Sequence, residues 1–295
     1  MKNKIIIMTD SNSGILQSEA EKLGIFVVPM PFTIDEEEYF EEISISQEKF
    51  YELLAQDANV TTSQPSQIYL EETWTKLLKS YDEIVYIPMS SGLSATCENA
   101  KNYAEKFNGK VFVVDNKRIS CNMKESVFEA IALAAQGKTG NQIKAYLERT
   151  WELFSVYIMV GTLKYLKKGG RISPAAAAIG SALNLKPILE TTGDKFEKVG
   201  MVLSVAQAKK KMLTRVKADI EGRFKQQYDE GTMTVSVAHT NNYAEAEKFK
   251  NEILKEFPNL KFRFVDPLSL SVSCHIGPGA LAVTLGNNAF MNEEK

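Results

Sequence analysis

Short apolar runs alternate with longer amphipathic segments along the first half of the chain. Four runs rich in β-branched residues predict strands at 4–9, 25–32, 84–88 and 111–115. Between them, helical spacing of apolar residues predicts helices near 13–23, 47–57, 67–79, 93–107 and 121–136. Runs such as "IIIM", "IVYI" and "VFVV" do not alternate with polar residues, which is typical of parallel strands buried on both faces. The first half therefore predicts a three-layer α/β/α domain.

The second half has a different pattern. "SVYIMVGTLKYLKKGGRIS" predicts a strand, a short helix that ends at Gly169 and Gly170, and a loop. "PAAAAIGSALNL" predicts a helix of small residues, and "KPILETTGDKFEKVGMVL" predicts a hairpin. A long helix near 205–228, the strand "TVSVAHT", a helix at 243–256 and the strand "KFRFVD" follow.

These patterns together predict an α/β fold of two domains, with the boundary near residue 155. Residues 1–155 would form the N-terminal α/β/α domain with a parallel sheet. Residues 156–295 would form a C-terminal two-layer α/β domain with a mixed sheet.

Composition narrows the class of protein. The chain of 295 residues is 44% hydrophobic and 24% charged, as soluble globular proteins are. A net charge of −2 gives no basic surface for nucleic acid, so no nucleic-acid partner is expected. The three cysteines, Cys97, Cys121 and Cys274, are far apart and form no C-x-x-C pair, which indicates neither a disulfide framework nor a thiolate zinc site. Without an apolar stretch of about 20 residues or an export signal, the expected location is cytoplasmic.

Polar residues follow three of the predicted parallel strands. "IIIM" is followed by "TDSNS", "IVYIPM" by "SSG", and "VFVV" by "DNK". Ligands of open parallel sheets bind at the carboxyl ends of the strands, so we expect the three loops to share one rim. Asp10 in the first loop would balance charge there or cap the following helix.

The loop "SSGLSAT" supports two interpretations. It approximates the G-x-S-x-G turn of serine hydrolases around Ser94, without the last glycine, and His239 or His275 could act as the base. Alternatively, its hydroxyls cap a helix, or hold an oxygen-rich anion at the helix N-terminus.

A second hydroxyl cluster, "TTSQPS", has Pro65 at a position typical of a first helical turn, which predicts a cap near Ser63 or Gln64. Thr62 or Ser63 would then project a hydroxyl toward the rim that carries Ser91 and Ser94. Two hydroxyl loops without a nearby base favour binding over catalysis.

The segment "LKYLKKGGRIS" places Lys164, Lys167, Lys168 and Arg171 beside two glycines. This is either a solvated basic face or a site where Arg171 reaches an anion or a partner. His275 in "CHIGPGA" is either packed or functional. Neither a phosphate-binding glycine loop nor H-E-x-x-H occurs, so no cofactor and no metal are expected.

Taken in order and spacing, "TDSNSGI", "TTSQPS", "SSGLSAT", "LKKGGRIS", "KPIL" and "HIGPGA" resemble the DegV family from residue 4 to about 285. The resemblance implies a non-catalytic, two-domain α/β protein that holds one long-chain fatty acid between its domains. It also implies a partner, the kinase subunit of a bacterial fatty acid kinase, which phosphorylates the acyl carboxylate with ATP for phospholipid synthesis. A lipid buffer without a kinase partner is the alternative within this class.

The resemblance also implies site residues. Thr62 and Ser94 would bind the carboxylate, with Ser63, Ser91 and the N–H of Gly92 as neighbours. His275 and Arg171 would face the same mouth or the kinase. The chain departs from the family pattern after "SGLS", where "ATC" replaces the frequent Gly-Thr-Tyr, so the preferred chain length is left open.

Affinity for such a ligand must come from its tail, because each buried methylene contributes about 0.8 kcal/mol. We expect a dry tunnel beside the small-residue helix at 175–182. Its expected walls are Phe26, Ile158, Ile179 and Leu183, although close helix–sheet packing would give the same composition. Loading through transient contact with a membrane surface would need a mobile element, for which 164–180 is the candidate.

Overall fold

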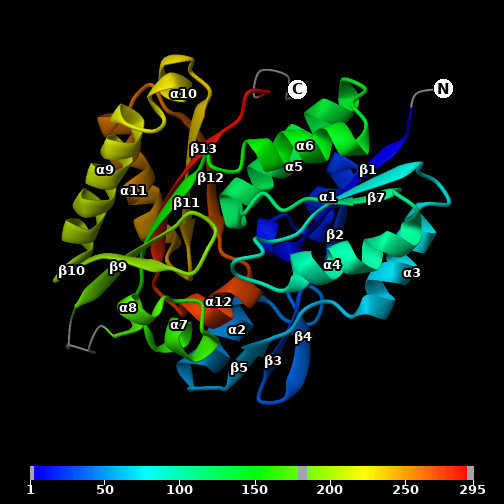
Figure 1. Cartoon of the computed structure of the whole chain (residues 1–295). Coiled ribbons are helices and arrows are strands. Elements are labelled where there is room, and N and C mark those ends of the chain that lie inside the picture. Colours follow the sequence, from blue (N-terminus) through cyan, green and yellow to red (C-terminus); the bar gives the residue numbers. More distant parts are fainter. Residues whose placement is uncertain (1–2, 179–184, 291–295) are drawn as a thin grey trace.

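A four-stranded parallel sheet organises the first half of the computed structural model, which describes residues 3–178 and 185–290 (Figure 1). Its strands lie in the order β2 (Phe26–Val28), β1 (Ile5–Asp10), β6 (Glu83–Ile87) and β7 (Val111–Val113). Helices α1 (Gln17–Leu23), α5 (Ser120–Ala135) and α6 (Gly140–Arg149) cover one face, and α3 (Gln67–Leu77) and α4 (Thr96–Ala104) cover the other. The predicted three-layer arrangement is confirmed, because each strand contributes apolar side chains to both faces.

A small antiparallel sheet, which the pattern did not predict, follows β2. It contains β4 (Glu37–Phe40), β3 (Pro31–Ile34) and β5 (Val60–Thr62) in that order, with α2 (Gln47–Ala55) beside it. The β3–β4 hairpin turns at Asp35 and Glu36, both with positive φ. Such turns usually carry Asn-Gly or Asp-Gly, so this sequence lacks the usual hairpin signal. The predicted strand at 25–32 is in fact divided between two sheets.

A six-stranded mixed sheet forms the second half. Its order is β10 (Glu197–Val202), β9 (Lys186–Thr191), β8 (Ser155–Met159), β13 (Leu281–Asn287), β11 (Met233–His239) and β12 (Lys261–Pro267). Within the described part of this sheet, β11–β12 is the only parallel pair and the other neighbours are antiparallel. One face packs against α9 (Val205–Glu221) and α11 (Tyr243–Glu256), with α10 (Lys225–Asp229) after α9. The predicted hairpin and mixed sheet are confirmed.

The other face of the mixed sheet turns toward the first half of the chain. The helices α7 (Lys164–Gly169), α8 (Pro174–Ala177) and α12 (Leu270–Ile276) pack there, together with Leu93 and Cys121 from the first half. The small sheet and α2 lie against α7 and α12 (Figure 1), where Phe32 and Phe50 share a core with Leu270. An apolar layer therefore joins the two halves.

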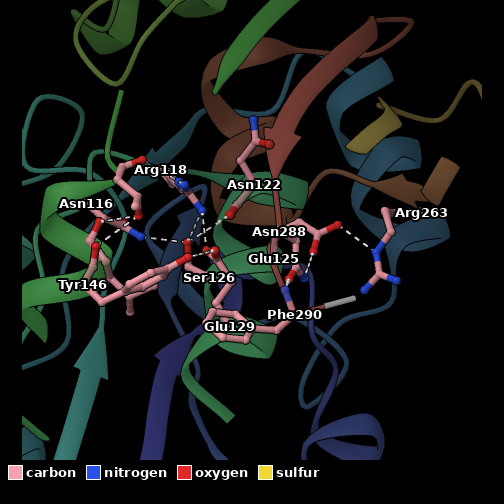
Figure 2. A network of polar contacts seen from close by, with 12 residues as sticks. Asn116, Arg118, Asn122, Glu125, Ser126, Glu129, Tyr146, Arg263, Asn288 and Phe290 are labelled. Atoms are coloured by element: carbon pink, nitrogen blue, oxygen red, sulfur yellow. Dashed lines mark hydrogen bonds and ion pairs between the residues drawn. The ribbon is translucent and has the colours of Figure 1, made fainter. Parts of the chain in front are cut away.

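Polar residues of α5 provide a second link between the halves (Figure 2). Within the first half, Arg118 of the loop before α5 donates to Glu129 Oε2 of α5 at 2.9 Å, and both side chains are fully buried. Further along α5, Glu125 accepts from Arg263 Nε of β12 at 2.8 Å and from Asn288 Nδ2 at 2.8 Å. Because β12 and Asn288 belong to the second half, α5 ties the two sheets together.

Most predicted helices are present with shorter bounds. The helix expected at 205–228 stops at Glu221, where Gly222 is followed by the short α10. Helix α6 was missed, although Thr139 and Gln142 form a capping box three residues apart. The predicted small-residue helix begins as α8, and half of it, residues 179–184, lies outside the described residues. The boundary near 155 coincides with the start of β8, and the division into domains 1–155 and 156–295 stays a prediction.

Candidate functional site

The loops after β1, β6 and β7 meet at one rim, as their pattern predicts. Asp10 accepts hydrogen bonds from the backbone N–H groups of Asn12 at 2.9 Å and Met89 at 3.0 Å. Asp115 accepts from the N–H of Ser91 at 3.3 Å. Burial raises the pKa of Asp10 to about 6, against the lowering effect of its backbone hydrogen bonds. Asp10 thus caps the turn Ser11–Ser13 and fixes the neighbouring loop, and it does not line the cavity described next.

A cavity of about 160 Å³ lies between this rim and the second half of the chain. Its open end is formed by the exposed residues Ser63, Gln64 and Ala95. The rest of the lining comes from both halves and combines hydroxyl, amide, basic and apolar side chains: Asn12, Met30, Thr62, Met89, Leu93, Ser94, Ile119, Leu166, Arg171, Phe196, Ser271, Val272, His275 and Ile276. The structure thus brings together Thr62, Ser63, Ser94, Arg171 and His275 from four separate segments.

Thr62 and His275 form a hydrogen-bonded pair across the two halves. Thr62 ends β5, and its Oγ1 lies 2.9 Å from Nε2 of His275 on α12. Helix α12 is held at its start by Glu41, which accepts from the N–H of Leu270 at 2.9 Å. With the imidazole proton on Nε2, Thr62 accepts from His275 and keeps its own hydroxyl proton for a ligand.

"TTSQPS" differs locally from its prediction. Thr62 belongs to a strand, and the N-cap of α3 is Ser66, whose hydroxyl accepts from the N–H of Tyr69 at 3.2 Å. Pro65 therefore precedes the cap, and the expected cap near Ser63 or Gln64 is wrong. A strand ending at Thr62 directs alternate side chains to opposite faces, so Thr62 lines the cavity whereas Thr61 bonds to Thr33 on the exposed side.

Ser94 lies just before α4. Its Oγ accepts from the N–H of Thr96 at 3.2 Å and lies 2.9 Å from the Thr96 hydroxyl. Ser91 and Gly92 belong to the same loop but do not line the cavity. The N–H of Gly92 donates to Ser90 Oγ at 3.1 Å, and a Cβ at Gly92 would lie 2.3 Å from Asp194 Oδ1. Gly92 therefore allows the close approach of the 193–194 turn, and its N–H already has a partner.

Basic side chains surround the histidine. Arg171 donates from Nε to the carbonyl of Leu93 at 3.1 Å and from Nη1 to that of Gly169 at 2.5 Å, so it bridges both halves at the cavity. Burial, and then the charges of Arg171 and Lys168, lower the pKa of His275 to about 4. His275 is therefore neutral at pH 7, and the positive potential that disfavours its protonation favours an anion in the cavity.

The lowered pKa of His275 predicts a loss of stability in acid. Between pH 7 and 5 the unfolded chain binds a proton on this histidine, with a usual pKa near 6.5, while the folded chain does not. The free energy of unfolding should therefore fall by about 2 kcal/mol more for the wild type than for His275→Gln over this range. Urea titrations at the two pH values measure this; an equal loss in both proteins would contradict the assigned environment.

An apolar extension continues from the inner end of the cavity. It shares Ile119, Phe196, Val272 and Ile276 with the main cavity and has a volume of about 20 Å³. The remaining lining residues are Ser120, Val156, Ile158, Ala238, Leu268, Ala282 and Thr284. Of the expected tunnel walls, Ile158 lies here, Phe26 packs instead beside α3 and α4, and Ile179 and Leu183 lie outside the described residues.

Asn12 and Ser271 are lining residues that the sequence reasoning missed. Asn12 lies in "TDSNS", a loop that the pattern placed at the rim, but nothing local distinguishes Asn12 from its neighbours. Ser271 comes from "SLSVSCHIG", a segment for which the pattern predicted no helix; its four-residue spacing from His275 on α12 was the available signal.

The geometry does not assemble a hydrolytic triad. His275 bonds to Thr62, Ser94 to Thr96, and the described contacts include no hydrogen bond between Ser94 and His275. Within residues 3–178 and 185–290, no group of three or more His, Cys, Asp or Glu side chains could hold a metal ion. In the described part of the chain, no helix combines the length and the hydrophobicity that a membrane span requires.

Fold and site together define a two-domain α/β protein with a hydroxyl-lined cavity, apolar at its inner end, between its halves. The family model described as "Uncharacterised protein, DegV family" matches residues 4–287. A DegV domain-containing protein of Listeria innocua is 30% identical over 293 residues, covering 96% of this chain and 99% of its own. A similar protein of Staphylococcus aureus is 28% identical over 284 residues, covering 96% and 98%.

Two solved structures of DegV family proteins resemble nearly the whole chain. A fatty-acid-binding DegV family protein of Thermus thermophilus has a TM-score of 0.86 at 28% identity, covering 96% of this chain and 99% of its own. DegV of Bacillus subtilis, described as a fatty acid binding protein, has a TM-score of 0.82 at 28% identity, covering 97% and 100%. The chain belongs to the DegV family.

Proposed function

We propose that the chain binds one long-chain fatty acid between its two halves, with the carboxylate at Thr62 and Ser94. The observation that carries the proposal is the cavity itself, in which hydroxyls and Arg171 lie toward the open end and an apolar extension lies at the inner end. An amphipathic anion matches both ends. The fatty acids bound by the Thermus thermophilus and Bacillus subtilis relatives support the same ligand class.

Hydrogen bonds would orient the carboxylate. Thr62, polarised by His275, and Ser94 each offer a hydroxyl, and Ser63 lies beside them at the open end. The N-terminus of α4 begins two residues after Ser94, so its dipole adds a favourable interaction with a negative charge. In this proposal Ser91 and Gly92 shape the loop, since they lie outside the lining.

The tail would occupy the apolar extension. Its volume of about 20 Å³ is close to the space for one water molecule, so the acyl chain would have to displace the surrounding side chains as it enters. Ala238 and Ala282, small residues of adjacent strands β11 and β13, line this end. Because these side chains are small, they leave space above the sheet for the acyl chain.

A larger side chain in the apolar extension should limit the length of the acyl chain that binds. Ala282→Leu adds three carbons and would exclude about three methylenes, worth about 2.4 kcal/mol. We expect the affinity for palmitate to fall more than 10-fold, while the affinity for the shorter laurate changes less than 3-fold. Calorimetric titration measures both, and thermal melting of the ligand-free proteins checks the fold. Equal losses for the two acids would place the tail elsewhere.

We further propose that the chain is a non-catalytic cytoplasmic subunit that presents the carboxylate to a fatty acid kinase. The kinase would transfer the γ-phosphoryl group of ATP to the bound carboxylate, giving acyl phosphate and ADP. Arg171, at the cavity and tied to the loop of Leu93, is placed to contact the ligand or the kinase. Loading would involve transient contact with a membrane surface.

Product analysis tests the kinase role. The palmitate-loaded chain, a fatty acid kinase catalytic subunit and ATP should yield palmitoyl phosphate, whereas palmitate without the chain should not. Failure to form acyl phosphate would favour a lipid buffer. Labelling of Ser94 by a fluorophosphonate would instead support the hydrolase hypothesis, which the separate partners of Ser94 and His275 oppose.

A further inference from the structure

One cavity-lining residue, Asn12, has a side-chain nitrogen without a hydrogen-bond partner among the described residues. Asn12 is 2% exposed and lines the cavity. Its Oδ1 accepts from the hydroxyl of Ser271 at 2.5 Å and from that of Ser269 at 3.3 Å. Its Nδ2 is buried and has no hydrogen-bond partner in the described part of the chain. A buried N–H group left unpaired is unfavourable, so a ligand oxygen that reached this group would be favoured.

The position of this amide relative to the proposed carboxylate site follows from α12. Ser271 and His275 are four residues apart, so they occupy one face of the helix about one turn, or about 5.4 Å, from each other. Val272 and Ile276 form a parallel apolar row that lines the extension. A carboxylate at Thr62 and His275 would therefore leave Asn12 about one helical turn away, beside the first carbons of the tail.

Asn12 and Ser271 together offer one hydrogen-bond donor and one acceptor. Nδ2 of Asn12 is a donor, and Ser271 Oγ, which gives its proton to Asn12, keeps a lone pair that can accept. A hydroxyl group both donates and accepts, so it satisfies the two residues together. A methylene satisfies neither, and a keto oxygen uses only the donor.

We propose that Asn12 and Ser271 form a subsite for a hydroxyl group near the carboxyl end of the acyl chain, so that the preferred ligand is a hydroxy fatty acid. This inference rests on the proposed carboxylate site at Thr62 and Ser94. It adds a second polar anchor, which fixes the chain at two points.

Competition between matched ligands tests the subsite. Native mass spectrometry or calorimetry would compare palmitate, 3-hydroxypalmitate and 16-hydroxypalmitate, the last with its hydroxyl at the distal end. The wild type should bind 3-hydroxypalmitate about 5-fold more tightly than palmitate, and 16-hydroxypalmitate more weakly than palmitate. In Asn12→Leu the preference for 3-hydroxypalmitate should disappear, because the donor is gone.

Two further variants serve as a second test of the subsite and as a control. Ser271→Ala should also reduce the preference and serves if Asn12→Leu does not fold. Ser269→Ala removes a hydroxyl that lies 3.3 Å from both Asn12 Oδ1 and Ser271 Oγ, but Ser269 lies outside the cavity lining, so this variant should keep the preference.

Three outcomes would overturn the inference. They are a wild type without preference, an unchanged preference in both cavity variants, and an equal loss of both ligands in Asn12→Leu, which would make Asn12 part of the carboxylate site. Failure of the wild type to bind any of the acids would instead contradict the proposed function.

Discussion

Replacing Thr62 with valine is expected to lower the affinity for palmitate about 10- to 100-fold. A hydrogen bond to a charged group contributes about 1.5–3 kcal/mol, and valine removes the hydroxyl while keeping the shape of the side chain. Ser94→Ala should have an effect of similar size. If the two hydroxyls bind one carboxylate, the affinity of the double variant for palmitate should fall by less than the product of the two single fold-changes. Calorimetric titration with palmitate measures each constant.

Thr61→Val is the matched control. Thr61 precedes Thr62 in β5, but its hydroxyl bonds to Thr33 at 2.6 Å and lies outside the cavity lining. The control should bind palmitate with wild-type affinity. Equal effects at positions 61 and 62 would mean that strand stability, and not a carboxylate contact, determines the affinity.

Glu129→Met is expected to lower the free energy of unfolding by about 3–5 kcal/mol. Glu129 is fully buried and pairs with Arg118, whose Nη1 also donates to Ser126 and whose Nη2 donates to the carbonyl of Thr150 (Figure 2). Removing one member of a buried ion pair leaves the other charge without its partner. Urea unfolding followed by circular dichroism measures the loss.

The double variant separates charge from packing. Arg118→Met with Glu129→Met removes both charges, so it should be more stable than Glu129→Met alone. As a surface control, Asp229→Ala removes the exposed pair with Lys225 and should change the stability by less than about 1 kcal/mol. If Glu129→Met is as stable as this control, the buried pair does not stabilise the packing of α5 against the loop after β7.

The parallel sheet could be predicted from the sequence because its strands are buried on both faces. "IVYI" and "VFVV" remain apolar without alternation, and their polar loops necessarily meet at one rim. The small antiparallel sheet could not be predicted in the same way. Its turn uses Asp35 and Glu36 with positive φ, and its third strand, β5, has only three residues. Tertiary packing against α12 supplies the stability that this local sequence does not.

The candidate site also combines residues that the sequence predicts with residues that it does not. Thr62, Ser94 and His275 lie in local motifs that a pattern of hydroxyls, glycines and a histidine marks, and the fold brings these motifs to one cavity. Asn12 and Ser271 are 259 positions apart and meet only because α12 packs over the rim of the first sheet. Such a contact has no local signal, so only the structure reveals it.

The most direct measurement is native mass spectrometry of the purified chain, followed by solvent extraction and identification of the released lipid. The account predicts one fatty acid per chain, lost on mild denaturation and recovered when palmitate or oleate is added. A chain that is isolated empty and takes up neither acid would contradict the proposed binding function.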